Sequence, residues 1–244
     1  METINKNMQV YRAADRGFAN HGWLQAAHSF SFANYYDPKK MQFGALRVLN
    51  DDIVGPGMGF GTHPHENMEI ITIPLEGALK HRDSMHNEWQ PINVGEVQIM
   101  SAGTGVQHSE MNGSPTEKLR LFQIWIIPNK QNVEPRYGQK KFDVAKRKDN
   151  LQVLVSSIDN PVDGSLTIHQ DAQISRIDLE KDKEFTYNIK SQNHGVYMLN
   201  ITGEVLTDSV TLEKRDAIGI SQIEKFNIKA NEDSSVLFIE VPLP

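Results

Sequence analysis

Short runs of apolar residues, many of them β-branched or aromatic, recur along the chain with turn residues between them. The runs are shorter than typical helices, and their composition is typical of β-strands. No segment shows the capped and periodic pattern of a helix of three or more turns. We therefore predict an all-β fold, a sandwich or barrel, whose strands include 43–50, 68–75, 97–100, 119–127, 196–201 and 235–243.

The chain divides into two halves of different character. Residues 1–130 contain seven of the nine histidines and twelve of the seventeen glycines. The segment 128–150 is polar and carries two prolines, a composition typical of a linker. We expect two domains, residues 1–137 and 138–244, which repeat one β module and carry chemistry only in the first copy.

Composition excludes several classes of protein. Because the chain has no cysteine, thiolate zinc sites, cysteine-held iron–sulfur clusters and cysteine nucleophiles are excluded, and any metal must be held by His, Asp or Glu. The 25 Lys and Arg against 31 Asp and Glu give a net charge of −6, which argues against nucleic-acid binding. No run approaches the roughly 18 uncharged apolar residues of a membrane helix, and the first residues are too polar for a signal peptide. We expect a cytoplasmic protein with no membrane partner.

Two pairs of residues of metal-ligand type stand two positions apart. His63 and His65 form the first pair, and His108 and Glu110 form the second. Residues i and i+2 of a strand face the same side, so the two side chains of each pair project together. If the two strands lie side by side, three imidazoles and one carboxylate converge. Such a set suits Fe, Mn, Ni, Cu or Zn and leaves positions open for chemistry.

The spacing around these pairs resembles the two signature motifs of the cupin superfamily, small double-sheet barrels with metal bound inside. The matching positions are Gly57, His63, His65 and Glu69 in the first motif and Gly95, His108 and Asn112 in the second. Ser101 stands where the second motif has proline, and two extra residues separate Gly103 from His108. These departures leave open whether Glu69 is the carboxylate ligand, as it would be in a standard cupin.

Further segments narrow the resemblance to one subfamily. The runs 16–38, 43–52, 59–70 and 99–110 are similar to those of the pirin family, specifically of its shorter bacterial members. The resemblance is strong over about residues 10–143 and weak over the rest. It implies a bicupin, in which two jelly-roll-type barrels lie face to face and only the N-terminal one binds metal. It also implies metal ligands at His63, His65, His108 and Glu110, with Glu69 serving the structure or orienting a ligand imidazole.

Bacterial members of this family are associated with quercetin 2,3-dioxygenase activity, so the resemblance implies a metal-dependent dioxygenase for flavonols. A flavonol 3-hydroxyl would bind one divalent transition metal per chain, and O₂ would open the ring with release of CO. We expect iron, with Mn, Ni, Cu, Zn or Co as alternatives, and a monomer. Glu110 is the expected catalytic residue, as fourth ligand, proton acceptor or both in turn. Phe60, Met100 and Met111 line the expected pocket or belong to the core.

Two other functions are weighed against this one. A metal-dependent redox-sensing or regulatory binding protein without catalysis follows from the resemblance to pirin, which is reported as a transcriptional co-regulator in eukaryotes. A cupin-type sugar-phosphate isomerase would need basic residues beside the histidine pairs, and residues 55–76 contain none. The regulatory protein is kept as the alternative, and the isomerase ranks last.

Other residues near these motifs receive no catalytic role. His81 and His86 flank a polar turn and are predicted to be solvated. His21 and His28 lie in the N-terminal run and are assigned to packing or to the rim of the pocket. Phe32 is expected in the core or between the domains.

Overall fold

The computed structural model of the chain describes residues 2–5, 7–208 and 210–244. Strands dominate these residues, and the helices among them are two short 3-10 helices, η1 (Ala13–Asp15) and η2 (Val144–Arg147). The predicted all-β fold is confirmed. Within the described ranges, neither helix is long and apolar enough to cross a membrane.

The N-terminal half of the chain forms two sheets. In spatial order, the larger one consists of β13 (Arg136–Lys141), β10 (Glu96–Ser101), β7 (Glu69–Glu76), β12 (Leu119–Ile126), β5 (Leu46–Val54), β4 (Leu24–His28) and β3 (Gly17–Asn20). The smaller one consists of β6 (Gly59–His65), β11 (Val106–Asn112), β8 (Ala78–Asp83) and β9 (Gln90–Asn93). The two predicted ligand pairs therefore lie on neighbouring strands of the smaller sheet.

The C-terminal half repeats this arrangement. Its larger sheet consists of β1 (Glu2–Asn5), β2 (Met8–Tyr11), β21 (Ala217–Ser221), β18 (His194–Thr202), β23 (Ser234–Pro242), β16 (Gln173–Leu179), β14 (Gln152–Ser157) and β15 (Leu166–Ile168). Its smaller sheet consists of β17 (Glu184–Asn188), β22 (Lys225–Ala230), β19 (Val205–Thr207) and β20 (Val210–Leu212). The expected repeat of one β module is thus visible in the sheets.

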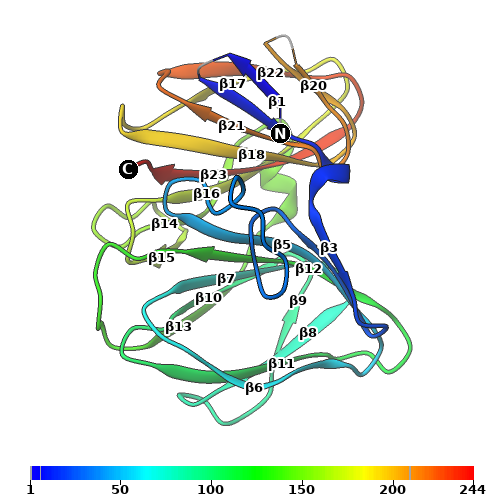
Figure 1. Cartoon of the computed structure of the whole chain (residues 1–244), viewed down its shortest axis with the longest axis vertical. Coiled ribbons are helices and arrows are strands. Elements are labelled where there is room, and N and C mark those ends of the chain that lie inside the picture. Colours follow the sequence, from blue (N-terminus) through cyan, green and yellow to red (C-terminus); the bar gives the residue numbers. More distant parts are fainter. Residues whose placement is uncertain (1, 6, 209) are drawn as a thin grey trace.

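The four sheets stack as layers, with the two larger sheets in the middle (Figure 1). Apolar side chains of both larger sheets meet in one core, to which β12 contributes Phe122 and Ile124 and β23 contributes Leu237 and Ile239. Because side chains alternate along a strand, Gln123 points the other way, into the space between the two N-terminal sheets. One face of β12 thus joins the domains, and the other face contributes to the site.

The predicted apolar runs coincide with β5, β7, β10, β12, β18 and β23, with slightly different ends. The largest differences are at β5, which we predict over 43–50 and which the structure places at Leu46–Val54. Phe43 and Leu46 exchange two backbone hydrogen bonds of 2.9 Å across a tight turn. Gly44 has a φ of 51° in this turn, and a Cβ there would lie 2.4 Å from the Pro242 carbonyl oxygen. The turn therefore requires glycine and separates Phe43 from the strand.

Two parts of the chain pair with strands on the other side of the expected division between residues 137 and 138. β13 contains this position and pairs along its length with β10 of the N-terminal half. At the start of the chain, β2 pairs with β21, and Met8 lies opposite Ile220. In Figure 1 the blue N-terminal strands accordingly lie with the yellow-to-red half. β1 and β2 therefore belong to the sheets of the second domain.

Candidate metal centre

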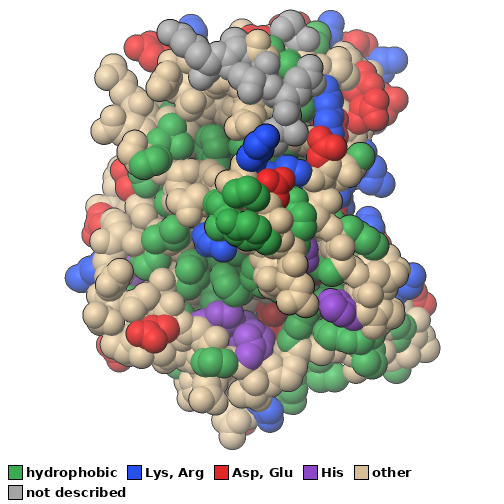
Figure 2. Space-filling view, viewed as in Figure 1, with side chains coloured by type: hydrophobic (Ala, Val, Ile, Leu, Met, Phe, Trp, Pro, Cys, Tyr) green, Lys and Arg blue, Asp and Glu red, His purple; other side chains and the backbone are tan. Residues whose placement is uncertain are grey.

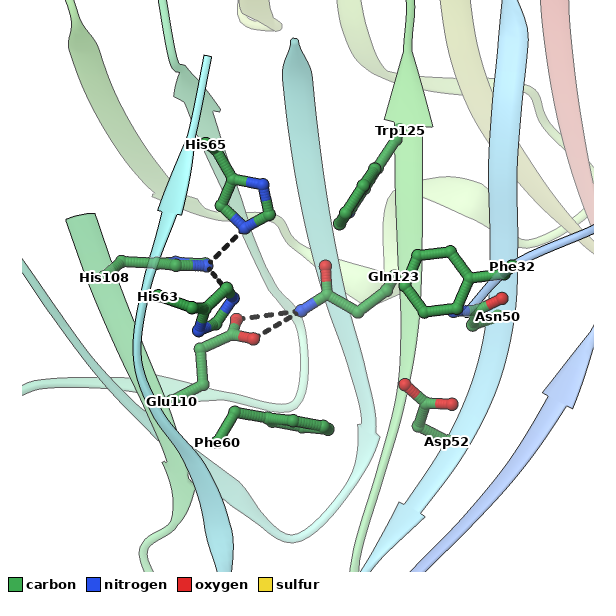
Figure 3. Close-up of a pocket in the computed structure, with 10 residues that line it drawn as sticks. All are labelled: Phe32, Asn50, Asp52, Phe60, His63, His65, His108, Glu110, Gln123 and Trp125. Atoms are coloured by element: carbon green, nitrogen blue, oxygen red, sulfur yellow. Dashed lines mark hydrogen bonds between the residues drawn. The ribbon is translucent and has the colours of Figure 1, made fainter. Parts of the chain in front are cut away.

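Strands β6 and β11 bring the predicted histidines together. The strands pair antiparallel with His108 opposite His63, as the sequence prediction required. The Nε2 atom of His108 lies 2.9 Å from Nε2 of His63 and 3.0 Å from Nε2 of His65 (Figure 3). The three imidazoles form a group that could hold a metal ion. His63 and His65 are half-buried, so the group is reachable from solvent.

The spacing and the charge of this triad fit a transition-metal ion. Nitrogens about 2.1 Å from an ion and at right angles around it lie about 3.0 Å apart, which is close to the observed separations. Burial, followed by the like charge of His63, lowers the pKa of His65 to about 4. Burial, followed by the charges of the neighbouring histidines, lowers the pKa of His108 to about 2. Both rings are neutral at pH 7 and offer lone pairs to a metal.

Hydrogen-bond partners contact the outer ring nitrogens of His63 and His108. His63 donates from Nδ1 to the Gly61 carbonyl oxygen at 2.8 Å, while its Nε2 faces Nε2 of His108. The Nδ1 atom of His108 lies 3.2 Å from Nε2 of His81. The Nδ1 atom of His81 in turn lies 3.7 Å from a carboxylate oxygen of Asp83. Partners of this kind set the tautomer and the orientation of ligand imidazoles.

The position of His81 corrects the sequence prediction. We predict a solvated side chain, whereas His81 is 1% exposed and lies beneath His108. Every second side chain of β8 is buried, namely Leu79, His81 and Asp83, so the buried face of this strand is mostly polar. Counting every second residue from the apolar Leu79 is the signal that could have indicated that His81 is buried. The prediction for His86 is confirmed, because its side chain is 60% exposed.

Glu110 lies on β11 beside the triad and is 4% exposed. The amide nitrogen of Gln123 donates to both carboxylate oxygens, at 2.9 and 2.8 Å (Figure 3). The Thr72 hydroxyl lies 3.5 Å from one of them. Burial raises the pKa of Glu110 to about 7, although these hydrogen bonds oppose the rise. Gln123 comes from the facing sheet, and no motif in the sequence indicates its role.

A pocket over the triad lies between the two N-terminal sheets. It is lined by Phe32, Asn50, Asp52, Phe60, His63, His65, His108, Glu110, Gln123 and Trp125 (Figure 3). On the face shown in Figure 2, histidine side chains lie beside apolar ones in the lower half of the molecule. Phe60 lines the pocket, whereas Met100 and Met111 lie outside its lining and Met100 belongs to the core. Phe32, which we expect in the core, is a pocket residue instead.

The wall of the pocket formed by β5 is polar. The Oδ1 atom of Asn50 lies 2.9 Å from Nδ1 of His28, which is buried behind Asn50 and outside the pocket lining, in keeping with packing rather than a place at the rim. Asp52 is 4% exposed, and its Oδ1 atom has no hydrogen-bond partner. Burial raises the pKa of Asp52 to about 8, and the charges of Asp51 and Glu110 add to the rise. Asp52 is therefore protonated at pH 7 and offers the pocket a hydrogen-bond donor.

Glu69 holds strands and domains together. It is 1% exposed and accepts a hydrogen bond of 2.7 Å from the Ser101 hydroxyl. It also accepts one from the backbone N–H of His169 in the second domain, while burial raises its pKa to about 7. Ser101 is the residue that replaces the proline of the cupin motif. The departure from the motif and the structural role of Glu69 therefore occur together.

Among the described residues, the triad is the one group of three or more potential ligands that lie close enough to share an ion. In the second domain, His194 is instead held by Glu240, with 2.9 Å between Nδ1 and the carboxylate oxygen. These features define a protein of two cupin domains with a candidate metal centre in the first. Residues 8–126 match the Pirin family, and residues 153–241 match the quercetinase C-terminal cupin domain. The chain belongs to the pirin family.

Similar proteins carry names that agree with this family. Quercetin 2,3-dioxygenase of Escherichia coli strain K12 is 47% identical over 231 residues, which cover 95% of this chain and 97% of the relative. The crystal structure of bacterial pirin YhhW from Escherichia coli in complex with nickel(II) has a TM-score of 0.90 and 43% identity, and covers 97% of this chain and 100% of that one. A quercetin 2,3-dioxygenase from Acinetobacter baumannii shares the fold, with a TM-score of 0.78 and 20% identity over 98% of this chain and 80% of its own. Fold and relatives together indicate a cupin dioxygenase family.

Proposed function

We propose that this protein is a metal-dependent dioxygenase that opens the ring of flavonols such as quercetin with O₂ and releases CO. The triad carries the proposal, because three imidazoles converge at a pocket that solvent reaches. Neutral imidazoles with open coordination positions beside them are the usual ligands of iron and related metals in oxygen chemistry. The name of the Escherichia coli relative supports the flavonol as substrate.

In this proposal His63, His65 and His108 hold the metal, and Glu110 is the fourth ligand, the proton acceptor or both in turn. The bound metal would polarise the flavonol 3-hydroxyl and allow reaction with O₂. Glu110 takes the proton of that hydroxyl, because its carboxylate lines the same pocket as the triad. Gln123 holds the carboxylate in place through its amide nitrogen.

The walls of the pocket suit a flat aromatic substrate with hydroxyl groups. Phe32, Phe60 and Trp125 supply aromatic surface, and their rings can pack against those of the flavonol. Asn50 and Asp52 on β5 offer hydrogen bonds to ring hydroxyls. The pocket thus combines an apolar lining with a few placed polar groups, as binding sites for small molecules do.

We also propose iron as the resident metal, with manganese, nickel, copper, zinc and cobalt as alternatives. Nickel is the metal in the structure of the Escherichia coli relative. We propose that the protein works as a monomer in the cytoplasm on a flavonol or another aromatic enediol, without binding nucleic acid. The net charge of −6 is in keeping with the last point.

The test is O₂ uptake and CO release by protein loaded separately with each metal, using quercetin and a panel of other enediols. We expect turnover by the wild type and by His169→Ala, a matched control outside the pocket, and loss of metal and turnover in His108→Ala. If fully loaded protein consumed no O₂ with any of these substrates, the dioxygenase proposal would be wrong. The regulatory binding function would then be favoured.

A further inference from the structure

A second site-like feature lies between the two domains, apart from the metal centre. It is a cleft of about 190 Å³ with five cationic side chains in its lining, Arg120, Arg147, Arg176, Lys214 and Arg215. Glu76 is the one carboxylate among the described residues that line it. This concentration of positive charge contrasts with the net charge of −6 of the whole chain.

On the N-terminal side of the cleft, two carboxylates contact the arginines. Asp51 accepts a hydrogen bond of 2.8 Å from Nε of Arg215 and lies 3.9 Å from Nε of Arg120. Glu76 is largely exposed, and its carboxylate lies 3.8 Å from Arg120. Both distances from Arg120 to these carboxylates are too long for hydrogen bonds. The Nε atom of Arg120 is buried and has no hydrogen-bond partner.

On the C-terminal side, one carboxylate serves two arginines. Asp178 accepts a hydrogen bond of 2.6 Å from Nε of Arg147 and lies 4.0 Å from Arg176. Arg176 is 8% exposed, and it donates from one terminal nitrogen to the Ser235 hydroxyl. Its Nε atom has no hydrogen-bond partner. Asp51 also lies 3.5 Å from a terminal nitrogen of Arg16, which is not in the lining. The three contacting carboxylates therefore leave an excess of at least two positive charges around the cleft.

The surroundings of Arg176 make this excess costly when nothing offsets it. A buried guanidinium without a full set of acceptors is unfavourable, because burial removes the water that would solvate it. Burial and the positive charges of Arg147 and Arg215 lower the pKa of Arg176 to about 10. An anion in the cleft would offset the charge and give acceptors to guanidinium groups that approach from both domains.

We propose that this cleft binds a small phosphate dianion, either inorganic phosphate or the phosphate ester of a small organic molecule. The excess of two positive charges matches a dianion. Guanidinium groups that come from different elements of both domains suit a tetrahedral oxyanion, whose acceptors point in several directions, better than a planar carboxylate. The volume of about 190 Å³ admits phosphate with a short substituent, beside the apolar side chains of Leu75 and Ile201. It is smaller than the pockets that hold drug-sized ligands.

The proposal is tested on the full chain by titration calorimetry with inorganic phosphate, glycerol phosphate and malonate at constant ionic strength. We expect one saturable phosphate site per chain, with malonate bound at least about tenfold more weakly than the better phosphate ligand. Tighter binding of glycerol phosphate would identify an ester as the ligand, and tighter binding of inorganic phosphate would identify the free anion. Equal binding of malonate, or the absence of a saturable site, would overturn the proposal.

Variants locate the site. Arg147→Gln should weaken phosphate binding roughly tenfold, as expected for loss of a charge-assisted contact. Lys214→Gln, at an exposed position, should weaken it about threefold without disturbing the fold. Lys225→Gln removes the same charge from exposed β22 outside the cleft and should leave binding unchanged. Circular dichroism checks that each variant is folded. Equal affinities of folded Lys214→Gln, Lys225→Gln and wild type would contradict the location.

Discussion

His81 shows how a single residue outside the ligand set supports the triad. It is buried beneath His108 and links that ring to Asp83 through the contacts described above. If Nε2 of His108 faces the metal, its Nδ1–H donates to His81, and both the orientation and the basicity of the ligand depend on this contact. The residue has no place in either sequence motif.

Replacement of His81 should therefore weaken the metal site without removing a ligand. We expect His81→Leu to lower metal affinity by about 10- to 100-fold, because such supporting partners contribute on that scale. Competition with a coloured chelator measures the affinity directly. His86→Leu is the matched control, since His86 lies in the loop that follows β8 and its side chain is exposed. Equal affinities of the two variants would contradict the role given to His81.

His194 in the second domain has a different role, which pH reveals. Its hydrogen bond to the buried carboxylate of Glu240 raises the pKa of His194 above its ordinary value. A raised pKa means that the folded state binds the proton more tightly, so this contribution to stability is present below pH 6.5 and is lost as the pH rises through the raised pKa. We expect His194→Gln to lower the free energy of unfolding by about 1–3 kcal/mol near pH 6.

The same variant should differ less from the wild type at about pH 9, where the wild-type imidazole is neutral. Urea unfolding of both proteins at the two pH values measures the difference. A gap that stayed constant or grew with pH would show that the charged pair with Glu240 does not stabilise the fold.

At the scale of elements, sequence reasoning succeeds where a strand has a regular apolar pattern. The runs at β7, β12 and β23 are buried on both faces, so most of their residues are apolar and the strand is evident. The strands of the site are different. β6 and β11 carry glycine, histidine and polar residues, and they were indicated by the spacing of His63/His65 and His108/Glu110 rather than by hydrophobicity.

The residues that sequence reasoning missed come from strands that face the motifs. Asn50 and Asp52 lie on β5, and Gln123 and Trp125 lie on β12, within segments whose other residues are mostly apolar. Local sequence shows that these strands exist but not which of their polar residues meets the triad, because that depends on the packing of two sheets. The same limit applies to the pairing of β2 with β21, which joins residues about 200 positions apart.

The pairing of β2 gives a test at this scale. A chain that begins at Arg12 lacks β1 and β2, loses the buried side chains of Met8, Val10 and Tyr11, and uncovers the edge of β21. We expect its free energy of unfolding to fall by at least about 3 kcal/mol, given the apolar area removed. Its metal content per folded chain should stay that of the full chain, because the triad lies in the other domain. Denaturant unfolding and metal analysis measure the two quantities, and unchanged stability would contradict the assignment of these strands.

In the whole molecule, the first domain contains the triad and the second packs against it. The second domain has the same arrangement of sheets, but its buried histidine is paired with Glu240 rather than gathered with other ligands. It packs against the first through the core that contains Phe122 and Leu237. This core supports β12 from behind, while the other face of β12 supplies Gln123 and Trp125 to the pocket. The domain without ligands thus helps to hold the walls of the site.

In the proposed function, the metal held by the triad supports insertion of both atoms of O₂ into a flavonol. The most direct measurement is mass spectrometry of the products formed from quercetin and isotopically labelled O₂ by the metal-loaded wild type. The released CO carries the ring carbon of the 3-hydroxyl with its original oxygen, so we expect unlabelled CO and a ring-opened product that contains both labelled atoms. Label in the CO, only one labelled atom in the product, or no product from fully loaded protein would contradict it.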